Sequence, residues 1–420
     1  MKRKDESSGV PLARSARALA VPGRNTCRLD GHELCAEAQR KTGLKNFGAP
    51  AIDPAFFILA ASLEREANLH WLGRRLMKIH LLGLLTARLK MAARCELRAG
   101  NYASSPSLPP IFITGMPRSG STFLHELLAQ DPSLRAPRVW EVMSPAEADE
   151  PDRGWHDSRV WQAAWCLWWF RRLAPRADAV YPMRARTPHE CVAIQSYTFL
   201  SEEFISTCHI PSYEAFLRST SLRAAYAWQK RFLNYLQCGR PPKRWILKSP
   251  DHVRGLEELF TVFPDALIIQ THRNPLDSLR SSIQLTEVLR RLYARPQPRE
   301  ELAEREARTM AWSVDRVIQF RDEHPELANR FVDVNYSELT SDPLAVVRRI
   351  YRRFEIPLSE AAVSNIRQLA CSRSAYKGRR TAPTLVETGL DPRAHLKLFG
   401  EYCRRFGIHG GPGRSKLTPL

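Results

Sequence analysis

Residues 111–122, IFITGMPRSGST, predict more of this chain's architecture than any other stretch. The first four, Ile111–Thr114, are apolar or β-branched, and such a short run is typical of a buried strand. Apolar residues at helical spacing follow from Phe123 to Leu128, so we expect a helix that ends near Asp131. A strand, a glycine-containing turn and a helix N-terminus form a phosphate-binding arrangement, because the free N–H groups of the first helical turn point at the anion.

The turn has the spacing of a P-loop but lacks its lysine. A Walker A motif reads GxxxxGK[ST], whereas here Ser121 follows Gly120 and the cation has moved to Arg118. Gly120 would let the backbone approach a ligand closely. Three hydroxyl groups of the turn can donate to the same anion, those of Ser119, Ser121 and Thr122. The missing lysine, and the lack of a convincing Walker B aspartate, argue against hydrolysis of ATP or GTP.

Three further runs have the length and composition of strands: Trp245–Leu247, Ala266–Gln270 and Phe331–Val334. Polar residues and then a helical pattern follow each run, which is typical of an α/β fold with a mainly parallel sheet and crossover helices. Ligands of such sheets bind beyond the carboxyl ends of the strands. Those ends carry Lys248 and Arg273, which together with Arg118 would form an anion site, although basic residues can also fall there by chance in a basic chain.

Outside this P-loop-like domain, predicted for residues 106–420, the chain changes character. Residues 1–30 are basic, polar and punctuated by proline and glycine, so we expect a flexible N-terminus. Residues 31–105 carry apolar residues at helical spacing, as at Phe56, Leu59 and Leu63, and predict a helical N-terminal extension.

The composition limits the class of partner. The formal charge of +19 indicates either an anionic partner or a generally arginine-rich surface. Arginine is spread along the chain, and no zinc-finger, RRM or KH signature is visible. We therefore expect no nucleic-acid partner.

The sequence also bears on location. The longest apolar runs, Ile79–Ala87 and Trp161–Phe170, are too short to cross a bilayer, and the first 30 residues lack the apolar segment of a secretory signal. The nine cysteines occur singly and in odd number, which suits a reducing compartment. We expect a cytoplasmic protein without a transmembrane segment.

A family resemblance appears once two motifs are placed together. The sequence PRSGST, residues 117–122, resembles the 5′-phosphosulfate loop of sulfotransferases that use 3′-phosphoadenosine 5′-phosphosulfate (PAPS). Arg273 at a strand end, with Ser281 eight residues later, is similar to the family's 3′-phosphate element, and an arginine fork suits such a phosphate. Tyr336 lies in a segment that resembles the one placed near the adenine. The resemblance covers roughly residues 109–410 and is closest to bacterial-type members.

The resemblance implies an activity and a binding site. The chain would transfer a sulfuryl group from PAPS to a hydroxyl or amine, release 3′-phosphoadenosine 5′-phosphate (PAP), and need no metal. The donor-binding residues would be Pro117, Arg118, Ser119, Gly120, Ser121, Thr122, Arg273, Ser281 and Tyr336. Lys248, assisted by Arg118, would stabilise the oxygen that bridges sulfur and the leaving phosphate.

The general base is open at this point. The histidine that cytosolic members place after a Lys-Thr pair is absent, because Pro250 follows Lys248-Ser249. Glu141, in a tryptophan-rich stretch, occupies a place comparable to the glutamate of other branches, and burial could raise its pKa into a useful range. His252, near the strand end at Lys248, is the second candidate. The remaining candidate for the base is His125, which can face ligand or core. Apart from the base, the pair His189-Glu190 could belong to an acceptor pocket.

Six tryptophans crowd into residues 140–169: Trp140, Trp155, Trp161, Trp165, Trp168 and Trp169. They could line an acceptor pocket, but large aromatic residues are more often core, and we predict core. The acceptor itself is not identified: small molecules, carbohydrates and lipids all remain open.

Two other functions compete with sulfuryl transfer. A P-loop nucleotide kinase or NTPase would need a cation beside Ser121 and an aspartate for magnesium. A non-catalytic nucleotide-binding relic of the fold would keep the architecture without turnover, and the intact basic residues disfavour it without excluding it.

Overall fold

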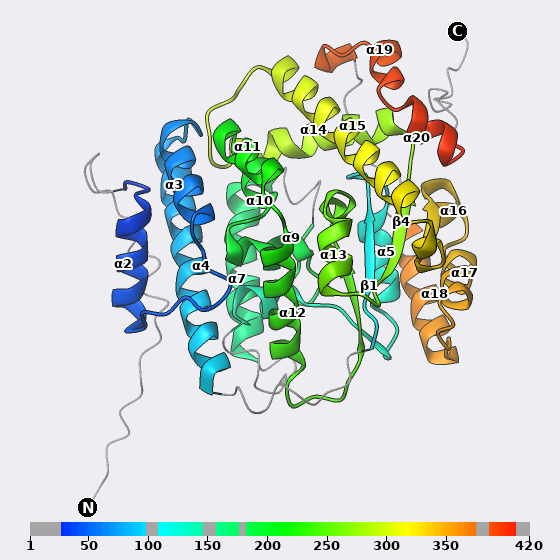
Figure 1. Ribbon diagram of the computed structural model, residues 1–420, viewed down its shortest axis with the longest axis horizontal. Helices are drawn as coiled ribbons and strands as arrows, with labels where there is room; N and C mark the ends of the chain where they lie inside the picture. The colour runs from blue at the N-terminus through cyan, green and yellow to red at the C-terminus, as the bar shows by residue number, and fades with distance from the viewer. Residues whose placement is uncertain (1–26, 98–107, 146–156, 176–181, 375–385, 409–420) are drawn as a thin grey trace, which may run out of the picture.

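Figure 1 shows a computed structural model of the chain, coloured from its N-terminus to its C-terminus. It describes residues 27–97, 108–145, 157–175, 182–374 and 386–408. Residues 1–26 of the predicted flexible segment 1–30 lie outside the described residues, and so does Trp155. The predicted boundary near residue 105 lies outside them too and stays a prediction.

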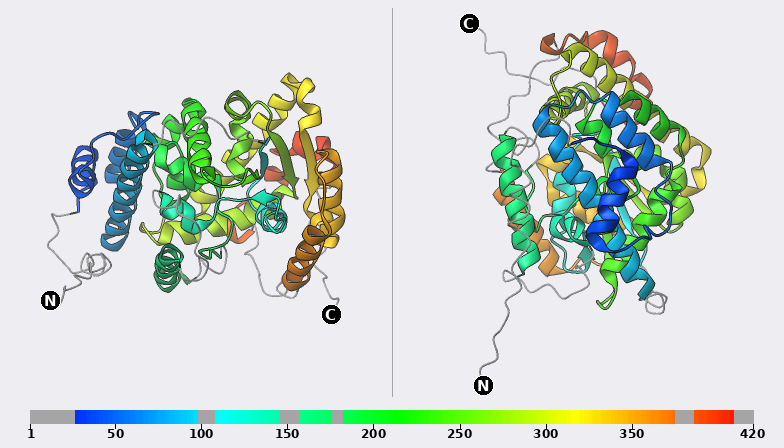
Figure 2. Two further views of the ribbon diagram at one scale, coloured as in Figure 1. Left: turned by 90° about the horizontal axis from the view of Figure 1, so that it is seen from below. Right: turned by 90° about the vertical axis from the view of Figure 1, so that its left-hand side faces the viewer.

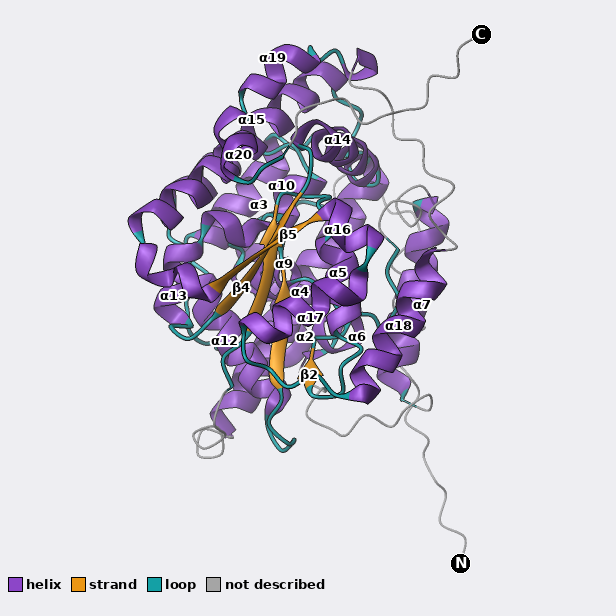
Figure 3. Ribbon diagram, turned by 90° about the vertical axis from the view of Figure 1, so that its right-hand side faces the viewer, coloured by secondary structure: helices purple, strands orange, loops and turns teal. Residues whose placement is uncertain are grey.

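A five-stranded parallel sheet forms the centre of the molecule (Figure 3). Its strands are β1 (Ile111–Gly115), β2 (Leu134–Arg135), β3 (Arg244–Lys248), β4 (Leu267–His272) and β5 (Phe331–Asn335), in the order β2-β3-β1-β4-β5. All four predicted strands are confirmed, and each paired strand runs parallel to its neighbour. The two-residue β2 was not predicted, because so short a segment carries no readable pattern. Because β1 is central, its carboxyl end lies between those of β3 and β4.

Helices cover the sheet on both faces, which explains why β1 and β4 are buried along their whole length. On one face Phe112 and Ile268 join a core that also contains residues of the N-terminal helices. On the other face Ile113 and Ile269 pack with the helices that follow β1 and β5.

The helices of the N-terminal half are α2 (Gly31–Thr42), α3 (Ala55–Arg65), α4 (Trp71–Leu97), α5 (Ser121–Leu128), α6 (Val139–Met143), α7 (Ser158–Leu173), α9 (Cys191–Gln195), α10 (Glu203–Thr207), α11 (Pro211–Ser219) and α12 (Arg223–Gln237). The helical N-terminal region is thus confirmed. Buried Arg88 of α4 anchors it, since its guanidinium donates to the carbonyl oxygens of Phe47 and Tyr197, the first at 2.9 Å.

The later helices are η4 (Pro250–Arg254), α13 (Leu256–Val262), α14 (Pro275–Arg291), α15 (Arg299–Glu323), α16 (Tyr336–Ser341), α17 (Pro343–Arg353), α18 (Glu360–Ser374), α19 (Pro392–Lys397) and α20 (Gly400–Arg405). Local sequence starts several of them. The Asn274 side chain accepts from the N–H groups of Leu276 and Asp277, and the Asp342 side chain caps α17 through Ala345 N at 2.9 Å. Proline at the first helical position of both helices fits these starts.

The prediction that the tryptophans form core is wrong for four of them. Trp140 is fully buried, but Trp161, Trp165, Trp168 and Trp169 are all exposed on α7. The cause is geometric: α7 turns Val160, Ala163 and Leu167 inward, so residues at the intervening positions face outward. Crowding of aromatics in sequence did not reveal which face of the helix is covered.

Within the described residues, no helix is both long enough and apolar enough to cross a membrane.

Candidate active site

The turn between β1 and α5 depends on two glycines. Gly115 has φ +135°, and a Cβ there would lie 2.3 Å from the carbonyl oxygen of Thr271 on the neighbouring strand. Gly120 has φ +95°, and a Cβ there would lie 2.9 Å from the Tyr336 ring. Any other residue would be strained in backbone and in space. The turn therefore packs tightly against β4 and α16, and α5 begins directly beyond it.

Ser119 stabilises the turn from within. Its hydroxyl is fully buried, donates to the carbonyl oxygen of Met116 at 2.6 Å, and lies 2.6 Å from the hydroxyl of Thr271. The contacts of this hydroxyl are thus with the protein, and the role of Ser119 in donor binding stays a prediction. Thr122, on the first turn of α5, is exposed.

The two predicted anion-binding elements contact each other. Arg118, with φ +66°, donates from Nε to Ser281 Oγ on α14 at 2.9 Å. Arg273, which follows β4, donates from Nη1 to the carbonyl oxygen of Arg118 at 2.9 Å. Segments that are far apart in the sequence are thus brought together at the carboxyl edge of the sheet.

Tyr336 lies against the same group. The Arg273 guanidinium stands 4.2 Å from the centre of the Tyr336 ring, a distance at which the cation is attracted to the ring face. Since the ring also lies against Gly120, Tyr336 links the end of β5 to the turn after β1.

Lys248 ends β3 on the other side of β1. Its ammonium donates to Thr122 Oγ1 at 3.1 Å and forms an ion pair with Glu190. The Lys248 side chain is 2% exposed and that of Glu190 is 13% exposed, so the carboxylate lies nearer the surface. The ammonium and the carboxylate therefore lie together beside the first turn of α5. A molecule bound there would be within reach of both a cation and a proton acceptor.

A short antiparallel contact between segments 137–140 and 185–189 positions Glu190. Val139 N donates to Thr187 O at 3.1 Å, Trp140 N to Ala185 O at 3.0 Å, and His189 N to Pro137 O at 2.7 Å. Glu190 follows directly as the residue that precedes α9. The backbone is thus fixed on both sides of the carboxylate, which limits the positions that the side chain can take.

Glu141, the first-ranked candidate base, lies in a different network. One carboxylate oxygen accepts from Arg135 at 2.8 Å and from Arg240 at 3.2 Å, and the other accepts from Arg138 N at 2.9 Å. Its side chain is 4% exposed. These contacts join the start of α6 to β2 and to the region after α12, which is a structural role.

The two histidine candidates are buried and neutral. His252 packs edge-on against Phe112, and its Nδ1 lies 2.9 Å from the Tyr226 hydroxyl. Burial, reinforced by the Lys248 ammonium, lowers the pKa of His252 to about 3. His125 donates from Nε2 to the Ile246 carbonyl oxygen at 3.2 Å, and burial likewise lowers its pKa to about 3. Both rings lie in the core beneath the site, and both feel the charges of Lys248 and Glu190.

Comparison with known proteins identifies the family. The model of the sulfotransferase family matches residues 109–360, which is more than half of the chain. This chain belongs to the sulfotransferase family. The match spans the β1 turn, the end of β3, the end of β4 and the start of α16.

Two kinds of relative extend the finding. The chain is 25% identical over 338 residues to the omega-hydroxy-beta-dihydromenaquinone-9 sulfotransferase Stf3 of Mycobacterium bovis and to its namesake in Mycobacterium tuberculosis, covering 74% of this chain and 78% of theirs. Among solved structures, sulfotransferase STF9 of Mycobacterium avium has a TM-score of 0.77 at 25% identity, covering 93% of this chain and 99% of its own. Sulfotransferase STF1 of Mycobacterium tuberculosis has a TM-score of 0.73 at 26% identity, with 88% and 98% covered. The mainly parallel α/β fold is therefore that of bacterial sulfotransferases.

In this sulfotransferase the pairing of Lys248 with Glu190 was not foreseen. The sequence suggested only that His189-Glu190 could line an acceptor pocket. No local pattern links Glu190 to Lys248 at the end of β3. The two residues are brought together by the antiparallel contact between segments 137–140 and 185–189. The only signal available was a carboxylate at the start of a short helical pattern, which is common in any protein.

The described residues hold no group of three or more His, Cys, Asp or Glu side chains that could bind a metal ion.

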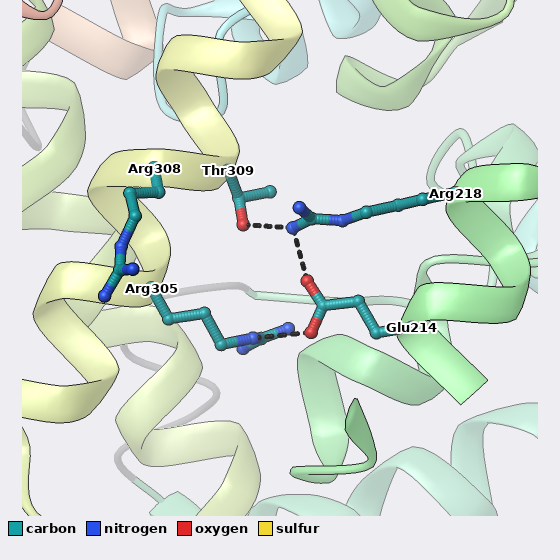
Figure 4. A pocket seen from close by; sticks show the side chains of 5 residues that line it. All are labelled: Glu214, Arg218, Arg305, Arg308 and Thr309. Carbon is teal, nitrogen blue, oxygen red and sulfur yellow. Dashed lines mark hydrogen bonds and ion pairs between the residues drawn. The ribbon is translucent and has the colours of Figure 1, made fainter. Parts of the chain in front are cut away.

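A separate pocket of about 270 Å³ lies between α11 and α15 (Figure 4). Its lining residues are Glu214, Arg218, Arg305, Arg308 and Thr309. Glu214 pairs with both Arg218 and Arg305, the latter at 2.8 Å, so part of the pocket's positive charge is neutralised internally. The pocket is not formed by the strand ends that carry the candidate active site.

Proposed function

We propose that this sulfotransferase transfers the sulfuryl group of PAPS to a hydroxyl group, with Glu190 as general base and Lys248 at the bridging oxygen. The observation that carries the proposal is the ion pair of these two residues beside Thr122. It supplies a proton acceptor and a cation at the phosphate-binding turn, and in-line sulfuryl transfer needs both.

The donor set fits PAPS. The 5′ side would be held by Arg118, Thr122 and the N–H groups at the start of α5, which have no partner inside the helix. The 3′-phosphate would be held by Arg273 and Ser281, which the turn already contacts through Arg118. Tyr336, whose ring lies against the Arg273 guanidinium, would contact the adenine. Pro117, Gly120 and Ser121 shape the turn, and Ser119 holds it closed from inside.

The reaction balances with these residues. The acceptor oxygen loses its proton to the Glu190 carboxylate as the new O–S bond forms. The bond from sulfur to the bridging oxygen breaks, and its electron pair stays on the 5′-phosphate of PAP. The Lys248 ammonium neutralises the charge that grows on that oxygen, helped by Arg118. Because Lys248 is almost fully buried, its charge is poorly screened and acts strongly at short range.

Glu190 is a better base than the candidates drawn from the sequence. Glu141 is held by two guanidinium groups and a backbone N–H, so all of its contacts favour a fixed carboxylate. His252 is 1% exposed, and a pKa of about 3 makes its ring a weak base at neutral pH.

For the acceptor we propose an apolar molecule with a terminal hydroxyl. The support is the relative that shares 25% identity and is named for an omega-hydroxy-beta-dihydromenaquinone-9 substrate.

A cytoplasmic location also belongs to this proposal. It is supported by the nine cysteines, all of which lie among the described residues without a disulfide.

The first test is thermal stabilisation by PAP without magnesium, with magnesium-ATP as the comparison. A ligand held at about 100 times its Kd should add roughly 2.7 kcal/mol of apparent stability. We expect a clear shift with PAP alone. A shift only with magnesium-ATP would contradict the proposal in favour of a kinase or NTPase, and a shift with neither would favour a non-catalytic relic of the fold.

A further inference from the structure

Helix α7 exposes an unusual amount of aromatic surface. Trp161, Trp165, Trp168 and Trp169 are 64%, 53%, 38% and 45% exposed. We call these four side chains the α7 tryptophan face. Single exposed apolar residues are normal, but several large ones gathered on one helix mark a site of interaction.

The face is ordered by its own contacts. The rings of Trp165 and Trp168 stack at 5.4 Å, and Trp169 meets Trp168 edge-on at 5.0 Å. On the opposite side of the helix, Val160 and Ala163 pack into the main core. Helix α7 is thus held to the body by its inner side, and Figures 2 and 3 show it on the outside of the molecule.

The charge of the helix is one-sided. From Ser158 to Leu173 it contains no aspartate or glutamate, and its last turn carries Arg171 and Arg172. The Arg172 guanidinium stands 5.0 Å from the centre of the Trp168 ring. The chain as a whole has a formal charge of +19. The acidic stretch 147–152 that precedes the helix in sequence lies outside the described residues.

The helix is also connected to the candidate active site. In the sequence it lies between Trp140 and Ala185, which are joined by a backbone hydrogen bond. Glu190 follows five residues after Ala185. A partner that binds α7 would therefore also restrain the stretch of chain between α7 and Glu190, the proposed base.

We propose that the α7 tryptophan face binds the surface of an anionic lipid bilayer. Tryptophan prefers the boundary between acyl chains and headgroups, because its ring is apolar and its N–H is a donor. Arginine at the edge of such a face pairs with anionic headgroups. The helix would lie in the plane of the interface, with its inner side still packed on the protein.

The alternative occupant of this face is a second copy of the chain. An apolar dimer contact would bury the same tryptophans, but the arginines of α7 in one copy would repel those in the other. Lipid binding and self-association therefore have different signatures in solution.

The test is flotation of the full chain with vesicles, measured for wild type and for Trp165→Gln/Trp169→Gln. Vesicles of phosphatidylcholine with phosphatidylglycerol are compared with pure phosphatidylcholine. We expect wild type to float with the anionic vesicles and the double variant to bind at least about tenfold more weakly. Arg172→Gln should weaken binding by about fivefold. Glutamine keeps the helix propensity high, so the fold should persist.

The matched control is Leu398→Gln, an apolar residue that is 45% exposed after α19. It should bind vesicles as wild type does. Stabilisation by PAP, measured on every variant, reports the donor site separately, so failure of the proposed function and failure of lipid binding are distinguishable. The proposal is overturned if wild type does not float, if the tryptophan variant floats equally well, or if light scattering shows a wild-type dimer that the tryptophan variant abolishes.

Discussion

The proposed donor site and the segment that carries the proposed base are built in different ways. The proposed donor site consists of strand ends: the turn after β1, Arg273 after β4 and Tyr336 after β5. Glu190, the proposed base, follows the antiparallel contact between segments 137–140 and 185–189, which lie before and after α7 in the sequence. The first is local in sequence at each strand, whereas the second is assembled by contacts between distant segments.

This difference explains which residues could be recognised. A parallel sheet brings the carboxyl ends of its strands to one edge whatever lies between them, so residues at those ends are expected to lie together without knowledge of the loops. No such rule places Glu190 beside Lys248, because their contact depends on how segment 185–189 packs against segment 137–140. The comparison predicts that donor binding and chemistry can be separated by mutation.

The largest expected effect is that of Glu190→Gln on the chemical step. Loss of the proton acceptor should lower the rate of sulfuryl transfer by about 10²–10⁴-fold, the usual contribution of a general base. The rate is measured with radiolabelled PAPS and a terminally hydroxylated isoprenoid quinone, and PAP binding is measured in parallel. PAP binding should persist.

The matched control is Glu141→Gln, which also removes a charge from a buried pair. Breaking its contacts with Arg135 and Arg240 should lower the melting temperature while the rate stays within a few-fold of wild type. The opposite pattern, a slow Glu141 variant beside an active Glu190 variant, would return the role of base to Glu141.

A smaller effect is expected on the donor side. Arg273→Ala should weaken PAP binding by about 2 kcal/mol, roughly thirtyfold in Kd, because a charged donor to the 3′-phosphate is lost. Arg280→Ala, on the helix that follows and 33% exposed, is the control and should bind PAP as wild type does. Calorimetric titration measures both, and unchanged affinity in a folded Arg273 variant would contradict the assignment of the 3′-phosphate site.

The smallest effect concerns pH. Burial lowers the pKa of His125 from 6.5 to about 3 in the folded protein. Between these values the unfolded state binds more protons, so the free energy of unfolding falls as the pH falls. Between pH 7 and pH 5.5 the loss from this one histidine should be about 1 kcal/mol. Urea unfolding of His125→Gln should show a shallower fall over that range, and parallel curves for the two proteins would refute the burial of a neutral ring.

The fold could be predicted in large part. The four longer strands, the parallel sheet and the helical N-terminal region follow from apolar periodicity and from the turn residues. Strand β2 could not be predicted, because two residues form no pattern. The burial of the tryptophans was predicted wrongly for α7, since a helix of mixed composition does not reveal which of its sides meets the body.

The amino-acid sequence alone contained the glycine-containing turn after β1, the basic strand ends and the resemblance to the family, because each of these depends on a short run of residues at a place that the sheet dictates. The tertiary structure alone paired Lys248 with Glu190, enclosed Glu141 and His252 in structural contacts, and placed four tryptophans outside. The physical reason is the range of the interactions: backbone propensity acts between neighbours, whereas burial and ion pairing depend on which distant segments come to lie side by side.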